Sequence, residues 1–271
     1  MHCAVLGSPI EHSLSPVLHR AAYVELGLPW TYQAIDVEEP QLAGFIRGLD
    51  RTWRGLSLTM PLKRTVMPLL DEADEWARIS GAANTVLLNH GSLAGYNTDI
   101  PGAVAALQER AAGPFSTAVV LGGGATAASM LIALGELGCT RARLLVREPS
   151  RAVETIEAVA RFERGPAIEV GTLGDPVGGA DVVVSTIPAA AQTSWLVRSA
   201  EACPVVFEVV YDPWPTPLAA AALRSGRLLV SGLDLLIHQA ALQVTLMTKM
   251  PAPVAAMRAA GEGALAARGA R

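Results

Sequence analysis

A glycine-rich turn between a buried strand and a helix constrains the fold of this chain more than any other feature. Residues 116–121 form a continuous apolar run, which is typical of a strand buried in a parallel sheet. Three glycines at 122–124 follow at once, and residues 125–137 are predicted to form a helix. The spacing Gly122-x-Gly124-x-x-Ala127 in this context is the pattern of a dinucleotide-binding turn. We therefore expect the turn and the helix N-terminus to hold a pyrophosphate.

The alternation of strands and helices continues after this turn. The second strand, 141–146, is followed by Arg147 and Glu148, about twenty residues beyond the glycines, where such domains read the adenosine ribose. This placement favours a dinucleotide site over a glycine-rich turn that binds nothing. We expect a Rossmann-like, doubly wound nucleotide domain, completed by a helix over 151–162 and strands over 168–170, 181–184, 205–210 and 227–231.

The first hundred residues show a second series of strands and helices. Because the two alternate, we expect an N-terminal α/β domain with a mainly parallel sheet. Two further helices are predicted near the end of the chain, over 233–250 and 253–267. The N-terminal elements are strands over 3–7, 31–37 and 55–59, helices over 16–26 and 39–48, an acidic helical segment over 66–80, and a hairpin-like pair over 83–88 and 93–96.

The composition excludes several classes of protein. Of 271 residues, 51% are hydrophobic and 17% are charged, so the chain has enough apolar surface to fold rather than remain disordered. The formal net charge is -4 without a run of like charges, which argues against a nucleic-acid partner. The uncharged stretch 111–135 is long enough to cross a bilayer, but its proline, hydroxyls and glycines favour the strand and turn described above.

The cysteines and the N-terminus indicate the cellular compartment. Cys3, Cys139 and Cys203 are far apart, odd in number and without a histidine at ligand spacing, so we expect neither disulfides nor a metal site. The N-terminus has no basic segment and no long apolar stretch typical of a signal peptide. We expect a reduced, cytoplasmic protein with no membrane partner.

Polar residues gather at the ends of predicted strands in the first hundred residues. Each cluster has an ordinary structural explanation, such as helix capping by Ser15 before Pro16, turn chemistry or a solvated lysine. Together they converge on one side of a sheet more than turns require. They predict a site for a small, hydroxyl-rich substrate with Lys63 and Asp99 as its ionisable pair. The clusters are Ser13 with Ser15, Ser57 with Thr59 and Lys63, Asn84-Thr85, and Asn97-Thr98-Asp99.

Six stretches, in order along nearly the whole chain, resemble the shikimate dehydrogenase family, whose members interconvert 3-dehydroshikimate and shikimate. The first and the fourth are particularly specific to this family. The stretches are Gly7-Ser-Pro-Ile-Glu-His-Ser-Leu-Ser-Pro16, Gly55-Leu-Ser-Leu-Thr-Met-Pro-Leu-Lys63, Gly81-Ala-Ala-Asn-Thr85, Tyr96-Asn-Thr-Asp99, Tyr211-Asp-Pro-Trp-Pro-Thr-Pro-Leu218 and Gly232-Leu-Asp-Leu-Leu-Ile-His-Gln-Ala240.

The resemblance implies roles for single residues. Lys63 and Asp99 match the catalytic pair, and we expect Lys63 to donate a proton in reduction and accept one in oxidation. Ser57 stands where the family usually has asparagine, which implies a bond to the substrate that is shorter in reach or water-mediated. The matched substrate-binding residues are Ser13 and Ser15 for the carboxylate, Tyr211 near that carboxylate, and Thr59, Asn84, Asp99 and Gln239 for the ring hydroxyls.

The resemblance also implies a domain arrangement, because the C-terminal helices of the family return to the first domain. We expect a substrate-binding catalytic domain over 1–100 with 239–271, and a dinucleotide-binding domain over 101–238. The site is then expected in a cleft that a hinge motion closes.

The residues that follow the second strand of the nucleotide domain give conflicting indications of whether the cofactor is NADP or NAD. Arg147 and Arg151 favour NADP, because their guanidinium groups can pair with a 2'-phosphate. Glu148 replaces a threonine of the family and favours NAD, because a carboxylate repels that phosphate and can accept bonds from a free 2'-hydroxyl. We predict NADP, with NAD as the alternative. The predicted cofactor-binding residues are Gly122, Gly123, Gly124, Ala125, Arg147, Glu148, Arg151, Thr186 and Gly232.

The predicted activity is the reversible NADP-dependent reduction of 3-dehydroshikimate to shikimate by a monomer or homodimer. Two alternatives remain open at this point. One is an NAD-dependent quinate/shikimate or amino-shikimate dehydrogenase, which shares most of these motifs. The other is a nucleotide-sensing module without turnover, which the retention of both Lys63 and Asp99 disfavours.

Overall fold

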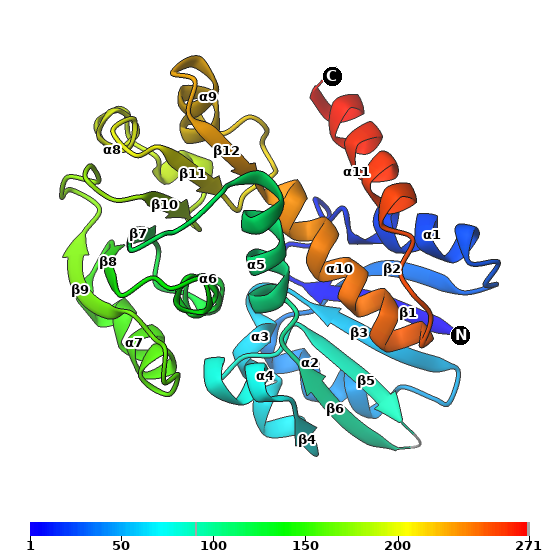
Figure 1. The fold of residues 1–271 in the computed structure, drawn as a ribbon. Helices are drawn as coiled ribbons and strands as arrows, with labels where there is room; N and C mark the ends of the chain where they lie inside the picture. Colours follow the sequence, from blue (N-terminus) through cyan, green and yellow to red (C-terminus); the bar gives the residue numbers. More distant parts are fainter. Residues whose placement is uncertain (90, 270–271) are drawn as a thin grey trace. The chain divides into compact units, whose positions relative to one another are not determined.

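Figure 1 shows the computed structural model of the chain, which describes residues 1–89 and 91–269. The chain divides into two compact units. The first unit combines Met1–Thr98 with Leu236–Arg271, and the second is the continuous segment Asp99–Leu235. The first unit is therefore built from both ends of the chain.

The first unit contains a six-stranded mixed sheet in the order β2-β1-β3-β5-β6-β4. β1 pairs in parallel with β2 and β3, whereas β5 is antiparallel to both β3 and β6. The expected hairpin-like pair is confirmed as β5 and β6. The strands are β1 (His2–Gly7), β2 (Thr31–Asp36), β3 (Trp53–Leu58), β4 (Glu72–Ala73), β5 (Thr85–Asn89) and β6 (Ser92–Tyr96).

Helices cover both faces of this sheet. Along β1, Ala4 and Leu6 point into a core shared with the helices α2 and α3, while Cys3 and Val5 point into a core that includes Tyr23 and Met247. α11 packs against α1, as Figure 1 shows in red and blue. The helices are α1 (Ser15–Glu25), α2 (Glu39–Arg47), α3 (Leu62–Thr65), α4 (Glu75–Ser80), α10 (Gly232–Thr248), which begins in the second unit, and α11 (Val254–Gly269).

The prediction of one helical segment over 66–80 is wrong in part. A 3-10 turn at Met67–Leu69 contains Pro68, which cannot donate a backbone hydrogen bond, and the chain then extends into the two-residue strand β4. Asp74 accepts a hydrogen bond from the Ala77 backbone N–H at 2.7 Å and so caps α4. A local turn and an edge strand therefore replace the first half of the predicted helix.

The second unit contains six parallel strands in the order β12-β11-β10-β7-β8-β9. Counted within the unit, this is the Rossmann order, with its reversal between the first and fourth strands. The predicted doubly wound fold is confirmed. The strands are β7 (Thr117–Leu121), β8 (Arg141–Val146), β9 (Ala167–Thr172), β10 (Val182–Ser185), β11 (Val205–Glu208) and β12 (Leu228–Ser231).

Five α-helices accompany this second sheet within the described residues, and three of them were not predicted. The sequence assigned no helix to α5, α8 or α9, and Pro101 and Gly102 near the start of α5 obscure its pattern. The stretch 111–135 forms β7, the glycine turn and most of α6, and no described helix is long and apolar enough to cross a membrane. The helices are α5 (Asp99–Arg110), α6 (Ala125–Glu136), α7 (Val153–Ala160), α8 (Ser194–Ala200) and α9 (Pro217–Arg224).

Candidate active site

The polar clusters of the first unit lie at one edge of its sheet. Ser13 and Ser15 follow β1, and Thr59 and Lys63 follow β3, which runs parallel to β1. Asn84 precedes β5, whose direction is reversed, so it lies at the same edge. The structure therefore brings these predicted residues to the carboxyl edge of β1 and β3, where α/β proteins commonly bind ligands.

Ser15 is the first residue of α1 rather than its cap. The N-cap is Leu14, which makes no side-chain capping bond, so the expected capping by Ser15 is wrong. The Ser13 hydroxyl instead accepts a hydrogen bond from the Ser15 backbone N–H at 3.3 Å. Ser15 is 5% exposed, and its hydroxyl has no partner among the described residues. A nearly buried hydroxyl without a partner suits a residue that binds a polar ligand group.

Thr59 and Lys63 are placed by the turn that follows β3. The Thr59 backbone N–H donates to Leu6 at 2.9 Å, and the Thr59 methyl group lies so close to Gly7 that a Cβ there would overlap it. The Thr59 hydroxyl has no partner among the described residues. Lys63 is half-buried in α3, and its carbonyl accepts from the Ala83 N–H at 2.8 Å. This bond ties the lysine to the segment that leads to Asn84.

Asn84 forms a buried cluster with Thr98 and Gln239. The Asn84 amide donates to the Thr98 hydroxyl at 2.9 Å and to Gln239 Oε1 at 3.2 Å. Gln239 belongs to α10, so one turn of a C-terminal helix completes a cluster begun by the first hundred residues. The cluster presents amide and hydroxyl groups of the kind that bind a polyol.

A second layer of buried polar groups holds this cluster in place. Gln243, one turn after Gln239, accepts from Ser57 Oγ at 2.7 Å and donates to the Asn84 carbonyl at 3.2 Å and to Thr85 Oγ1 at 2.9 Å. His19 also contacts Gln243 Oε1, at 3.2 Å, and stacks on Tyr32. Burial lowers the pKa of His19 to about 3, so His19 is neutral here. Sequence reasoning did not identify His19, Tyr32 or Gln243.

This layer changes the expected role of Ser57. Its hydroxyl accepts from Tyr32 at 2.6 Å and donates to Gln243 at 2.7 Å, and the residue is 3% exposed. The hydroxyl is thus used within the protein rather than offered to a ligand. We now expect Ser57 to position Gln243 and Asn84 instead of contacting substrate.

In the second unit, the three glycines of the turn have different environments. Gly122 has φ +107°, which favours glycine, and a Cβ there would overlap the Thr186 hydroxyl. A Cβ on Gly123 would lie 2.6 Å from the Arg151 carbonyl oxygen. At Gly124 a Cβ would meet nothing within 4 Å. The first two glycines are therefore required by the protein's own packing, whereas the space beside Gly124 is open.

The open space lies at the start of α6, next to the point where the strand order reverses. Gly124 is the N-cap of this helix, and no side chain caps it, so backbone N–H groups of its first turn lack intrahelical partners. An uncapped helix N-terminus beside an open glycine attracts a pyrophosphate. Residues 122–125 therefore fit a dinucleotide, with Ala125 as the first helical residue.

The remaining predicted cofactor residues differ in exposure. Arg147, Glu148 and Arg151 are exposed just after β8, and Glu148 forms no ion pair with any described residue. Thr186 follows β10, and its hydroxyl donates to the Leu121 carbonyl at 2.8 Å. This bond joins the ends of β7 and β10, the two strands between which the strand order reverses. Gly232 starts α10 so close to the Val209 backbone that a Cβ would overlap it. Gly232 is therefore explained by packing, and its contact with a cofactor stays a prediction.

Two predicted residues belong to the second unit although their partners were expected in the first. Asp99 begins α5 and is 5% exposed, and Tyr211 is half-buried after β11. The pairing of Asp99 with Lys63 and the contact of Tyr211 with substrate stay predictions.

Glu208, which sequence reasoning did not identify, is a fully buried carboxyl group at the end of β11. It accepts hydrogen bonds from Gln192 Nε2 at 2.7 Å, Thr216 Oγ1 at 2.8 Å and the Val210 N–H at 3.1 Å. Burial raises its pKa to about 7, against an ordinary value of 4.5, despite these donors. A single acidic residue inside the apolar run 205–210 was the available signal.

This raised pKa makes the stability of the protein depend on pH. The folded state binds the Glu208 proton more tightly than the unfolded state, so the contribution to the free energy of unfolding is full below pH 4.5 and is lost as the pH rises towards 7. The total change corresponds to roughly 3 kcal/mol. We expect Glu208→Gln to flatten the slope of unfolding free energy between about pH 5 and 7, measured by urea denaturation.

Glu157→Gln provides the matched control, because Glu157 is an exposed glutamate on α7 of the same unit. It is expected to keep the wild-type slope. An unchanged slope in the Glu208 variant would show that this carboxyl group titrates alike in the folded and unfolded states.

A Rossmann sheet with an open glycine turn, together with a unit that carries a lysine and a cluster of amide and hydroxyl groups, defines a dinucleotide-dependent α/β oxidoreductase. Two family models match the chain: "Shikimate dehydrogenase substrate binding domain" over residues 5–86 and "Shikimate 5'-dehydrogenase C-terminal domain" over residues 232–260. The chain belongs to the shikimate dehydrogenase family, which confirms the resemblance found in the sequence motifs.

Known proteins are similar over nearly the full chain. The shikimate dehydrogenase (NADP(+)) of Moorella thermoacetica is 38% identical over 266 residues, covering 94% of this chain and 90% of that protein. The crystal structure of Mycobacterium tuberculosis shikimate dehydrogenase is 39% identical, with a TM-score of 0.87 over 97% of this chain and 99% of its own. The Thermus thermophilus enzyme, solved with NADP(H) and shikimate, is 31% identical with a TM-score of 0.83, covering 97% and 99%.

Proposed function

We propose that this protein catalyses the reversible NADP-dependent reduction of 3-dehydroshikimate to shikimate. The observation that carries this proposal is the convergence of Ser15, Thr59, Lys63 and the Asn84 cluster at one sheet edge. Two of these hydroxyls have no partner among the described residues, which suits a small ligand rich in hydroxyl groups. The relatives named above as shikimate dehydrogenases support the choice of substrate.

The chemistry divides between cofactor and protein. When bound, NADPH would supply the hydride for reduction and NADP+ would accept it in oxidation, and residues 122–125 would hold the pyrophosphate of either form. Lys63 donates a proton to the substrate carbonyl oxygen during reduction and takes it back during oxidation. Asp99 is proposed to hold the Lys63 amine in place. Ser13 and Ser15 bind the carboxylate, Tyr211 lies near it, and Thr59, Asn84 and Gln239 bind ring hydroxyls.

A quinate dehydrogenase is the second candidate, because the solved structure of such an enzyme is similar to this chain. Quinate dehydrogenase from Corynebacterium glutamicum, solved with NAD, is 27% identical with a TM-score of 0.84. Initial rates with shikimate and with quinate, each with NADP+ and NAD+, test both proposals by absorbance of the reduced cofactor. We expect the highest kcat/KM for shikimate with NADP+. A higher kcat/KM for quinate with NAD+ would replace the first proposal with the second.

Arg147 and Glu148 set the choice of cofactor in this proposal. Because Glu148 is exposed and unpaired among the described residues, solvent screens its repulsion of a 2'-phosphate, whereas a guanidinium can bind that phosphate through two parallel N–H groups. We expect NADP+ to be preferred. Removing the carboxylate in Glu148→Thr should raise the NADP+ to NAD+ ratio of kcat/KM by about three- to tenfold.

The control for this prediction is Glu154→Gln, an exposed acid on the next helix, α7, which should leave the ratio unchanged. If the kcat/KM of the wild-type enzyme were at least about tenfold higher with NAD+ than with NADP+, the proposed contact of the arginines with a 2'-phosphate would be contradicted.

We also propose a cytoplasmic location and a monomeric or homodimeric state. All three cysteines are buried free thiols, which suits a reducing compartment.

A further inference from the structure

A cavity of about 810 Å³ lies in the first unit, at the sheet edge opposite the candidate active site. It is lined by residues that precede parallel strands, such as Met1 before β1 and Trp30 before β2, and by Asn89 at the end of the reversed strand β5. The active-site clusters follow β1 and β3 instead. Strands of six residues separate the two edges, which corresponds to roughly 20 Å. The cavity is therefore not part of the proposed substrate site.

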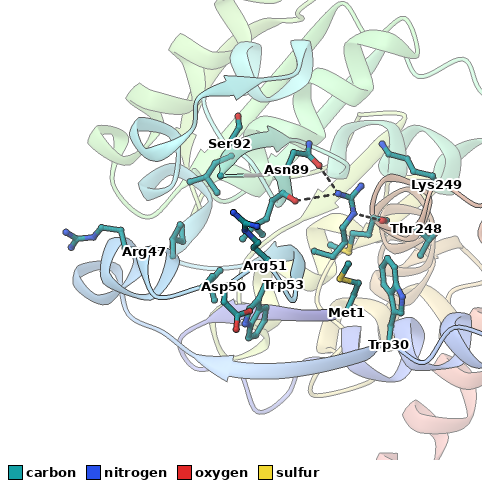
Figure 2. Close-up of a pocket in the computed structure, with 17 residues that line it drawn as sticks. Met1, Trp30, Arg47, Asp50, Arg51, Trp53, Asn89, Ser92, Thr248 and Lys249 are labelled. Atoms are coloured by element: carbon teal, nitrogen blue, oxygen red, sulfur yellow. Dashed lines mark hydrogen bonds between the residues drawn. The ribbon is translucent and has the colours of Figure 1, made fainter.

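Positive charge is concentrated at this cavity although the chain carries a net charge of -4. Arg47, Arg51, Arg54 and Lys249 line it, and Figure 2 shows the guanidinium end of Arg47 pointing away from the others. Asp50 is the one acidic residue among the described lining residues, and it accepts hydrogen bonds from the Thr52 N–H and hydroxyl rather than pairing with an arginine. The described lining therefore holds more cations than carboxylates, and none of these cations forms an ion pair with Asp50.

Arg54 is a half-buried cation held entirely by neutral acceptors. It donates to the Met247 carbonyl at 2.8 Å, to Asn89 Oδ1 at 2.7 Å and, weakly, to the Leu88 carbonyl, and the dashed lines in Figure 2 mark these bonds. No described carboxylate pairs with it. These bonds fix the guanidinium at the wall of the cavity and leave its charge available to an anion.

Lys249 is fixed in an unusual backbone conformation. Its φ of +63° places it in the left-handed region just after α10 ends, where glycine or asparagine is more common. Neither Lys249 nor Arg51 has a side-chain partner among the described residues. Two unpaired cations therefore flank the fixed Arg54.

The other walls of the cavity are apolar and aromatic. Trp30 and Trp53 both line it, and each ring is held by an edge-to-face contact, with Tyr23 and Phe45 respectively. The volume lies within the usual range for small-molecule sites, which combine aromatic walls with a few polar groups. We propose that this cavity is a second, non-catalytic site for an aromatic organic anion, whose ring contacts the indoles and whose acidic group binds Arg51, Arg54 and Lys249.

Fluorescence titration with anilinonaphthalene sulfonate, an aromatic anion, tests this proposal. N-phenylnaphthylamine, which has similar rings without the sulfonate, is the uncharged comparison. Every titration contains saturating NADP+, so that the glycine turn is not the site measured. We expect the sulfonate to bind at least about tenfold more tightly than the neutral compound, with a Kd that rises with ionic strength.

The double variant Arg51→Gln, Lys249→Asn removes the two unpaired cations and keeps a residue that tolerates positive φ. We expect it to weaken sulfonate binding roughly five- to tenfold and to leave the neutral compound unaffected. Arg198→Gln with Arg224→Gln removes the same charge from exposed, unpaired positions of the second unit and should change neither Kd. Equal sulfonate affinities in the wild-type protein and the first double variant would overturn the proposal.

Discussion

Lys63→Ala is expected to lower kcat at least about 100-fold while changing the KM for shikimate much less. General acid–base groups typically contribute this much, and they act on the transition state rather than on bound substrate. Lys63 is half-buried on α3, and its backbone is tied to Ala83, so removal of the side chain should leave the local fold intact. Steady-state kinetics in both directions give the two parameters.

Two further variants distinguish the loss of proton transfer by Lys63 from the loss of its positive charge. Lys63→Arg keeps the charge, but a guanidinium does not release its proton at accessible pH, so we expect a comparable loss of kcat. Arg198→Ala removes an exposed cation of the second unit and should retain full activity. Near wild-type turnover in either Lys63 variant would exclude Lys63 as the proton donor.

The second large effect is expected from Gly124→Ala, which should weaken NADP+ binding at least about tenfold at only a small cost in stability. The added methyl group meets no protein atom within 4 Å, but it occupies the open space where a pyrophosphate would approach the backbone. Alanine is a poorer N-cap residue than glycine, which costs about 1 kcal/mol, so Tm should fall by no more than about 4 °C. Calorimetric titration with NADP+ and thermal unfolding measure the two quantities.

Gly123→Ala is the comparison for this variant. Its methyl group would lie 2.6 Å from the Arg151 carbonyl oxygen, so this change should lower Tm more than Gly124→Ala does, in addition to lowering the affinity. Wild-type affinity in Gly124→Ala would mean that the cofactor does not approach the start of α6.

The elements predicted best from the sequence are those with a strong local pattern. The apolar run before Gly122 forms β7, and the following helix ends one residue before the predicted Leu137. Prediction failed where a local signal was ambiguous, as at Pro68, where acidic residues suggested a helix that the proline interrupts. α5 was missed for a related reason, because Pro101 and Gly102 lie in its first turn.

The residues of the candidate site also differ in whether a local sequence pattern predicts them. Ser15, Thr59 and Lys63 could be proposed because each follows a strand and belongs to a recognisable motif. Gln243 could not, because its bond to Ser57 joins positions 186 residues apart and no local pattern indicates it. Ser57 was expected to contact substrate because it stands at a substrate-binding position of the family, and its bond to Gln243 could not be seen in the sequence around it.

The division of the first unit between the two ends of the chain has a consequence for the order of events on the ribosome. Cys3, Val5 and Tyr23 pack in a core with Met247, which is translated about 150 residues after Thr98. At typical elongation rates this delay lasts roughly 10 to 30 s. During that time the continuous second unit can complete its own sheet. One face of the nascent first sheet is not yet covered by α10 and stays accessible to chaperones.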